Sequence, residues 1–181
     1  MPCLSVFSTS QAQHPYKVLG WPEHVIAALA EAGVHYEQCL PAMPLSRDSS
    51  DEDVLAAYAE AVAQLLESSA GLAVQLVRIS HGQAPAHAPH AQSLEEHSHD
   101  EDERHLFVAG QALLSLHVGD TVYQLLCEKG DLLILPAGIL HWLDFGAEEN
   151  CVVIRVLGSE QGAQVKLSGD PLAANFARLE D

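Results

Sequence analysis

The chain has 181 residues, 48% of them hydrophobic, which is enough for one domain with a substantial core and excludes a disordered chain. Its 25 Asp and Glu against 8 Lys and Arg give a formal net charge of -17, so neither a nucleic acid nor an anionic membrane surface is an expected partner. The first residues show no signal-peptide pattern, no apolar run reaches the roughly 18 residues needed to span a membrane, and the four cysteines form no CxxC pair. We therefore expect a cytoplasmic protein with reduced thiols.

The first elements along the chain are a short strand and a helix. Cys3–Phe7 is a short run of β type. A helix is expected over Pro22–Ala32, where apolar residues share one face. Pro22 suits a first helical turn and Gly33 suits the stop, so both ends of this helix are marked in the sequence.

A second helix is expected over Asp51–Ser68. Ser49 and Glu52 resemble a capping box at its start, and an apolar stripe follows at helical spacing. Residues 73–79 are expected to form a strand, and residues 82–92 lack any period and are expected to form a loop. The histidines in or near this loop, which we expect at the surface, are His81, His87 and His90.

The second half of the chain alternates short apolar runs with turn signals. Many short, closely spaced strands indicate an antiparallel barrel or jelly roll, so the expected fold class is mainly β with flanking helices. The tail from Pro171 is expected to form a short helix. The apolar runs are Leu113–Val118, Thr121–Cys127, Leu132–Leu135, His141–Phe145 and Cys151–Leu157.

Four residues form the constellation with the clearest chemistry. His97 and His99 share a face if their segment is a strand, and Glu103 has the same parity. Two imidazoles and one carboxylate suit iron(II), and a further imidazole from His141 extends the choice to nickel, manganese or zinc. An isolated H-x-H pair is more often surface, and an isolated His141 would more often be a core residue. The joint spacing is therefore the argument for a metal site.

This spacing resembles the cupin superfamily. The first cupin motif contains H-x-H, three or four residues, Glu, six residues and Gly, and residues 97–110 match it. The second contains Gly, five residues, Pro-x-Gly, two residues and His, and residues 130–141 match it. The resemblance implies a double-stranded β-helix, that is, a jelly-roll barrel. One domain, 1–181, would then comprise N-terminal helices and strands over 1–93, a metal-binding core over 94–168 and a tail over 169–181.

Within the cupins, the chain most closely resembles the acireductone dioxygenase family. Its two N-terminal helices also fit that family, so the resemblance covers most of the chain. The segments that carry it are Glu96–His99, Glu101–Glu103, Leu116–Asp120, Val122-Tyr123, Leu126–Leu132, Pro136-Ala137, His141-Trp142, Asp144 and Ile154-Arg155.

The resemblance implies a specific reaction. His97, His99, Glu103 and His141 would bind one Fe²⁺ or Ni²⁺ per chain. The small-molecule substrate would be acireductone (1,2-dihydroxy-3-keto-5-methylthiopentene), cleaved with O₂ in methionine salvage. The iron form would give formate and 4-methylthio-2-oxobutanoate, and the nickel form formate, carbon monoxide and 3-methylthiopropanoate. The resemblance favours a monomer, with no nucleic acid or membrane partner.

The chain departs from the family around the substrate. His105 stands where the family has a substrate-facing arginine, and its charge depends on pH. Strand parity places His105 on the face of Glu103, whereas Arg104 would turn inward only with a one-residue bulge. Arg155 would either supply positive charge or form a surface ion pair. Phe107 and Trp142 are further candidates for the pocket wall. The positions at which the pocket is altered are His105, Ala109, Leu143 and Ala163.

These departures leave two other functions open. A cupin enzyme with another chelating enediol or a diketone as substrate is the main alternative. A non-enzymatic module that binds a metal or a small molecule is the third interpretation, although a complete ligand set and the lack of a recognisable signalling domain argue against it.

Overall fold

In the computed structural model of the protein, residues 2–46, 48–67, 73–79, 93–146, 151–159 and 164–179 are described. The strands in these segments are β1 Cys3–Ser8, β2 Lys17–Leu19, β3 His35–Gln38, β4 Ala73–Ile79, β5 His97–Ser98, β6 Glu103–Ala109, β7 Ala112–Val118, β8 Thr121–Cys127, β9 Asp131–Leu135, β10 Leu140–Asp144, β11 Cys151–Leu157 and β12 Lys166–Leu167. The helices are α1 Pro22–Glu31, α2 Asp51–Ala57, α3 Ala59–Glu67 and the 3₁₀ helix η1 Pro171–Asn175.

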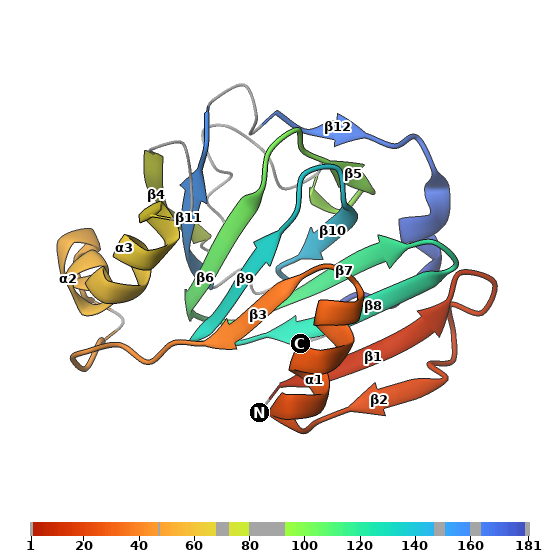
Figure 1. Ribbon diagram of the computed structural model, residues 1–181, viewed down its shortest axis with the longest axis horizontal. Helices are drawn as coiled ribbons and strands as arrows, with labels where there is room; N and C mark the ends of the chain where they lie inside the picture. The colour runs from red at the N-terminus through yellow and green to blue at the C-terminus, as the bar shows by residue number, and fades with distance from the viewer. Residues whose placement is uncertain are drawn as a thin grey trace.

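The described strands form two antiparallel sheets that together make a barrel (Figure 1). The seven-stranded sheet has the order β12-β5-β10-β7-β8-β1-β2, and the five-stranded sheet has the order β3-β9-β6-β11-β4. The early strands β1 to β4 are hydrogen-bonded members of these sheets, since β1 pairs with β8 and β4 pairs with β11 over its whole length. The prediction of a mainly β, jelly-roll fold is confirmed.

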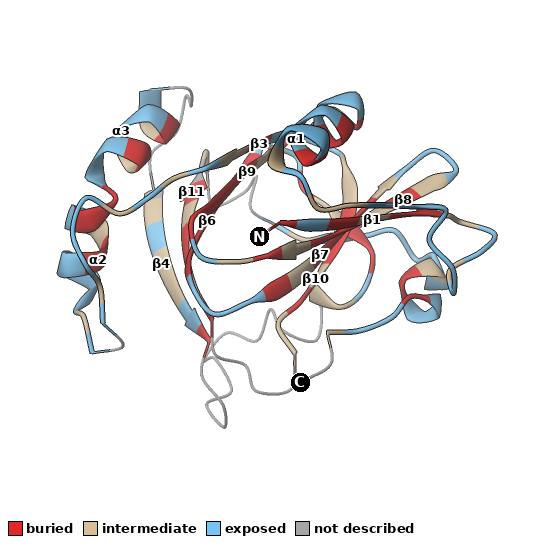
Figure 2. Ribbon diagram, turned by 90° about the horizontal axis from the view of Figure 1, so that it is seen from below, coloured by how far each residue is buried: buried red, intermediate tan, exposed pale blue. Residues whose placement is uncertain are grey.

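Strand β6 is buried on both faces from Glu103 to Val108, and only its last residue is exposed. Phe107 belongs to the cluster inside the barrel, whereas Leu106 and Val108 belong to the cluster under α2 and α3. Because neighbouring side chains of a strand point to opposite faces, β6 separates the barrel interior from this helical layer. Figure 2 shows the buried strands between the helices, whose outer sides are exposed.

Helix α1 agrees with the sequence-based prediction to within one residue. It starts at Pro22 and ends at Glu31, and its buried residues Val25, Ala28 and Leu29 pack into the barrel cluster. Gly33 has a φ of 80°, a conformation that L side chains rarely adopt, so the stop signal acts as expected.

The prediction of one helix over 51–68 is wrong, because the chain forms two short helices separated at Tyr58. Tyr58 has φ -114° and ψ 20° and is 2% exposed. The break lets α2 and α3 each turn a buried face, with Val54 and Leu65, onto the five-stranded sheet. This packing outweighs the local preference for a continuous helix.

The predicted capping box was placed one residue too early. Ser50 is the N-cap of α2, and its hydroxyl accepts the backbone N–H of Asp53 at 3.1 Å. The Asp53 carboxylate in turn accepts the backbone N–H of Ser50, also at 3.1 Å. Asp at the third helical position therefore does the work that a Glu or Gln does in the usual box.

The predicted strands over 73–79, 121–127 and 151–157 have the bounds of β4, β8 and β11, and the remaining ones differ by one or two residues. The short helix expected from Pro171 is the 3₁₀ helix η1, which ends at Asn175. The predicted loop over 82–92, with His81, His87 and His90, lies outside the described residues, as does Ala163.

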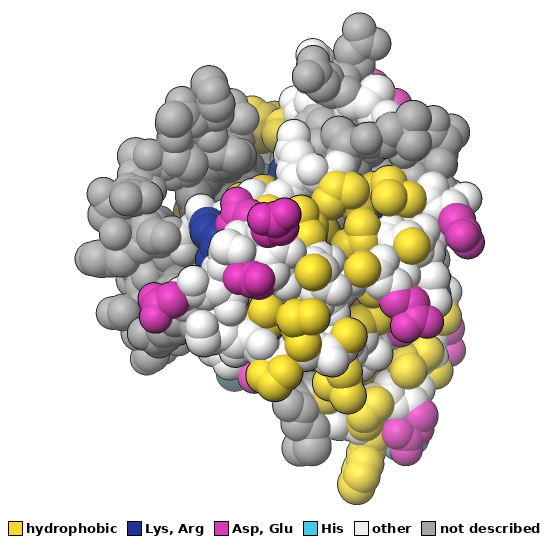
Figure 3. All heavy atoms as spheres, turned by 90° about the vertical axis from the view of Figure 1, so that its left-hand side faces the viewer, with side chains coloured by type: hydrophobic (Ala, Val, Ile, Leu, Met, Phe, Trp, Pro, Cys, Tyr) yellow, Lys and Arg dark blue, Asp and Glu magenta, His cyan; other side chains and the backbone are white. Residues whose placement is uncertain are grey.

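None of the described helices combines the length and the apolar character that crossing a membrane requires. The face over α2, α3 and β4 carries acidic and scattered hydrophobic side chains, with little Lys or Arg among the described residues (Figure 3). Such a face repels polyanions.

Candidate metal centre

Three histidines converge at one end of the barrel interior. His97 and His141 are directly opposite each other across β5 and β10, and His99 lies just beyond the end of β5. Their ligand nitrogen atoms all lie within 4.8 Å of one another, and the three side chains are buried. The spacing predicted from the sequence is therefore brought together in space, and the three residues form a site that can hold a metal ion.

Backbone carbonyls orient two of these rings. The Nδ1 of His97 lies 2.7 Å from the carbonyl oxygen of Glu95, and the Nδ1 of His141 lies 3.1 Å from that of Ile139. Because a carbonyl oxygen can only accept, each Nδ1 carries the proton, and the Nε2 of each ring has a lone pair. This second hydrogen bond is the usual support of a metal-binding histidine.

Glu103, the first residue of β6, adds a carboxylate to the cluster. Its Oε2 lies 3.0 Å from Nε2 of His141, and its Oε1 lies 3.3 Å from Nε2 of His99. When His141 carries its proton on Nδ1, its Nε2 and the carboxylate oxygen are two acceptors at hydrogen-bond distance. Such a contact is stable only when a cation or a second proton lies between them, so the donor set fits a metal ion.

The protonation of the cluster also favours a cation. Burial, followed by the neighbouring His141, lowers the pKa of His97 to about 4. Burial likewise lowers the pKa of His99. Although burial by itself raises the pKa of Glu103, the neighbouring His105 and His141 hold that pKa well below its usual range. At neutral pH His97 and His99 are therefore neutral beside an ionised carboxylate, the protonation state that metal binding requires.

Arg155 forms an ion pair within the site rather than at the outer surface. It lies in β11 opposite His105, and one of its terminal nitrogens donates to Oε1 of Glu103 at 2.8 Å. Its Nε is buried and has no hydrogen-bond partner among the described residues. The guanidinium therefore keeps one donor for a molecule in the cavity.

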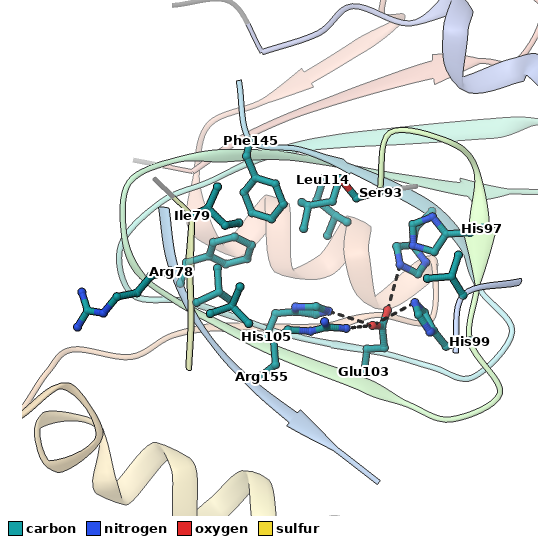
Figure 4. A pocket seen from close by; sticks show the side chains of 16 residues that line it. Arg78, Ile79, Ser93, His97, His99, Glu103, His105, Leu114, Phe145 and Arg155 are labelled. Atoms are coloured by element: carbon teal, nitrogen blue, oxygen red, sulfur yellow. Dashed lines mark hydrogen bonds and ion pairs between the residues drawn. The ribbon is translucent and has the colours of Figure 1, made fainter. Parts of the chain in front are cut away.

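His105 lies on the same side of β6 as Glu103, as strand parity predicted. Its Nε2 is 3.7 Å from Oε1 of Glu103, and burial lowers its pKa (Figure 4). Its Nδ1 is buried without a hydrogen-bond partner among the described residues. Arg104 lies on the other face, where its guanidinium is 3.5 Å from the carboxylate of Asp102, and it does not line the cavity among the described residues.

A cavity of about 260 Å³ extends from the histidine cluster into the barrel. Its far end is apolar, and Figure 4 shows Phe145 and Ile79 at the end opposite to His97 and His99. The predicted wall residue Phe107 lines this cavity. The hydrophobic side chains along it are Val77, Ile79, Phe107, Leu114, Leu143, Phe145, Val153 and Val165.

Two of the predicted pocket residues lie elsewhere. Trp142 is 1% exposed and packs in a separate cluster, with its ring 5.6 Å from that of Phe176. It occupies the face of β10 opposite to His141 and Leu143, so parity could have excluded it. Ala109 is exposed at the end of β6, so this departure from the family does not alter the cavity wall, whereas Leu143 does line it.

Ile79 and Phe145 line the cavity but were not among the predicted site residues. Ile79 ends β4 on the same face as Val77, and Phe145 follows β10 on the face of His141 and Leu143. The alternation of side chains along a strand shows that these residues share a face with Val77 and with His141. It does not show which face of a strand buried on both sides encloses the cavity.

Comparison with known proteins gives consistent matches. A family model described as the ARD/ARD' family matches residues 43–164. The acireductone dioxygenase of Stutzerimonas stutzeri (strain A1501) is 38% identical over 181 residues, covering all of both chains. That of Pseudomonas aeruginosa (strain UCBPP-PA14) is 35% identical, again over the full length of both.

A solved structure is similar in fold. The acireductone dioxygenase from Bacillus anthracis with a cadmium ion in its active centre superimposes with a TM-score of 0.77. The alignment covers 91% of this chain and 97% of that chain at 20% sequence identity. At this identity the match supports the barrel architecture and its order of strands, and the chemistry has to be argued from the residues of this chain.

Proposed function

This chain belongs to the ARD/ARD' family, whose relatives over its full length are named acireductone dioxygenases, and we propose that it cleaves acireductone with O₂ in methionine salvage. The observation that carries this proposal is the cluster of three imidazoles and one carboxylate at the end of a mostly apolar cavity. A metal site beside an enclosed apolar space suits an O₂-dependent reaction of a small chelating molecule.

The proposed ligands of a single metal ion are His97, His99, Glu103 and His141. His97 and His141 would bind through Nε2, because their Nδ1 atoms are held by backbone carbonyls. Glu103 supplies the negative charge, and Arg155 and His105 fix the orientation of its carboxylate. The two strands that carry Glu103 and His141 are in different sheets, so the rigid barrel sets the distance between the ligands.

The proposed ion is Fe²⁺ or Ni²⁺, one per chain. When bound, it supplies Lewis acidity that favours the substrate anion and orients it toward O₂. Family resemblance implies formate and 4-methylthio-2-oxobutanoate as the products with iron. With nickel it implies formate, carbon monoxide and 3-methylthiopropanoate. Both outcomes use the same protein ligands, so the metal loaded into this chain would decide the products.

The side chains around the cluster would bind and orient the substrate. Arg155 keeps an unpartnered Nε among the described residues, which can donate to a substrate oxygen, and His105 keeps an unpartnered Nδ1, which can accept from a substrate hydroxyl. Phe107 and the apolar end of the cavity would enclose the alkylthio tail and exclude water. Arg104 and Trp142 are not among the described residues that line the cavity, so we do not include them in the proposed substrate contacts.

A second candidate function follows from His105. A neutral imidazole at this place offers one hydrogen bond where a guanidinium would offer a fixed charge and several donors. Leu143 also contributes to the altered wall. These two side chains favour, as the alternative, a cupin dioxygenase for another small enediol or diketone that chelates the same ion.

The test is the rate of acireductone loss under O₂, with protein reloaded anaerobically with Fe²⁺. The controls are His97→Ala, which removes one ligand, and His14→Ala, which changes an exposed histidine. Loss that is fast in the wild type and in His14→Ala, and absent in His97→Ala, supports the proposal. Metal binding without acireductone loss contradicts it and directs the search to other chelating enediols and diketones.

Three further expectations belong to this proposal. The chain is expected to act as a monomer, which size-exclusion chromatography with light scattering would check. A cytoplasmic location suits a soluble small-molecule substrate. Its net charge of -17 favours neither nucleic acid nor an anionic membrane as a partner.

A further inference from the structure

The apolar end of the cavity is formed partly by the chain that leaves β10. Leu143 and Phe145 both line the cavity, and Phe145 lies at the end remote from His97 and His99 (Figure 4). Phe145 follows the last residue of β10 and lies beyond the residue pairs that join β10 to β7. Other contacts must therefore fix the position of this ring.

Asp144, the residue before Phe145, provides such contacts with both of its carboxylate oxygens. One oxygen accepts the backbone N–H of Gly146 at 2.9 Å, and the other accepts the backbone N–H of Leu179 at 3.0 Å. The side chain is 8% exposed, so water does not compete strongly for these bonds. Asp144 thus ties the backbone on both sides of Phe145 to the C-terminal segment.

Gly146 and Leu179 are also packed closely together. Gly146 has a φ of 71°, and a Cβ atom at this position would lie 3.3 Å from Cδ2 of Leu179. A larger residue would be strained by its backbone angle and crowded by Leu179. The turn that carries Phe145 is therefore shaped to receive the C-terminal segment.

The residues just before Leu179 are anchored to the barrel. The ring of Phe176 packs edge-on against Phe7, with centroids 5.5 Å apart. The side-chain amide of Gln124 donates to the carbonyl oxygen of Ala177 at 3.3 Å. Phe7 and Gln124 lie in β1 and β8, which carry none of the candidate metal ligands. Their contacts hold the C-terminal segment against the barrel.

The same segment also contacts the chain beside a second cavity-lining residue, Ser93. The guanidinium of Arg178 donates to the carbonyl oxygen of Leu94 at 3.3 Å and 3.4 Å. Leu94 adjoins Ser93, which lines the cavity. Residues 176–179, which we call the C-terminal clasp, thus bridge two cavity-lining segments that are about 50 residues apart in sequence.

We propose that the C-terminal clasp sets the depth of the apolar end of the cavity, and that Asp144 is the positioning residue through which it holds Phe145 against the substrate tail. The inference rests on the proposed function only for the identity of the tail. Its consequence is that tail selectivity depends on residues 176–179, although they are remote from the metal ligands. When the clasp is released, Phe145 can move outward and longer tails fit.

The test uses alkyl hydroxamates, which chelate a metal through two oxygens and carry a tail of chosen length. The measured quantity is the ratio of the Kd for butanohydroxamate to the Kd for decanohydroxamate, by calorimetry on the Ni²⁺-loaded protein. Asp144→Asn leaves the size of the side chain unchanged but removes one of the two acceptors. A chain that ends at Phe176 is the second variant. Asp170→Asn is the matched control, because among the described residues the carboxylate of Asp170 accepts only the backbone N–H of Leu172.

Both variants are expected to raise the ratio of the Kd for butanohydroxamate to the Kd for decanohydroxamate by about fivefold or more. A few methylene groups in an apolar pocket are enough for that discrimination. The Kd for the short hydroxamate is expected to stay within about twofold of the wild type. Asp170→Asn should behave as the wild type. A ratio that is unchanged in both variants overturns the inference.

Hydrogen exchange of the metal-free protein is the second measurement, and it does not depend on any substrate. The backbone amides of residues 143–146 are expected to exchange faster in Asp144→Asn and in the shortened chain than in Asp170→Asn. Unchanged exchange there overturns the clasp. If the wild-type protein binds no hydroxamate but the two variants still exchange faster than Asp170→Asn, the proposed metal function fails while the clasp stands.

Discussion

Replacing Arg155 by methionine should destabilise the metal-free protein much more than the nickel-loaded protein. Arg155 donates to Oε1 of Glu103 at 2.8 Å, and the side chain of Glu103 is 5% exposed. Methionine keeps most of the apolar stem but no positive charge, so the change leaves the buried carboxylate with the imidazoles as its main partners. A bound Ni²⁺ would compensate the same carboxylate.

The magnitude follows from the geometry. Two unit charges about 4 Å apart attract by about 4 kcal/mol at an effective dielectric constant of about 20. The side chain of Arg155 is 24% exposed and the imidazoles share the carboxylate, so a cost of about 3 kcal/mol is expected without metal. With nickel bound, the expected cost falls to about 1.5 kcal/mol. By the thermodynamic cycle, Arg155→Met should then bind Ni²⁺ about tenfold more tightly.

The assay is urea unfolding of both proteins, without metal and with Ni²⁺ in excess, combined with a direct nickel titration. Arg78→Met is the matched control, because Arg78 pairs with Asp51 at 2.7 Å near the surface. Its cost should be below about 1 kcal/mol and independent of metal. Equal destabilisation of Arg155→Met with and without nickel would refute the reasoning, since Glu103 would then not be a ligand.

Two further predictions concern the metal-free fold. The pKa of His97 is about 4 in the folded protein and 6.5 in the unfolded chain, so the unfolded chain binds the proton more readily. The free energy of unfolding should therefore fall by about 3 kcal/mol as the pH drops from 6.5 to 4. Urea unfolding of His97→Gln at pH 7 and pH 4.5 should show a correspondingly weaker pH dependence, and an identical one would contradict the assignment. Gly130→Ala should cost about 2 kcal/mol or more in thermal unfolding, because φ is 94° and the new Cβ would lie 2.9 Å from the carbonyl oxygen of Cys39. Gly119→Ala, with φ 60° and no neighbour within 4 Å, should cost less, and equal costs would show that the contact with Cys39 is unimportant.

Local periodicity explains where prediction from sequence succeeded. The runs over β8 and β11 are bounded by turn residues, so their ends are visible in the chain itself. Strand parity also placed His105 beside Glu103 and turned Arg104 away, since alternation is a property of any extended strand.

Tertiary packing explains where prediction failed. Tyr58 interrupts an expected continuous helix because two short helices cover the sheet better than one, and nothing in the local sequence marks this break. Trp142 was a candidate for the cavity wall, yet its ring is buried against Phe176, which is 34 residues away in the chain. No local pattern around Trp142 indicates that Phe176 is its partner.

The sequence by itself predicted the barrel and the four candidate metal ligands, because motif spacing and strand alternation depend only on neighbours along the chain. The departure at His105 followed from the resemblance to the family. Only the tertiary structure decided that Arg155 pairs with Glu103 and that Leu179 closes on Asp144. Those contacts depend on the register between β6 and β11 and on the path of the tail over the barrel. Both are set by the packing of the whole core, which no local pattern encodes.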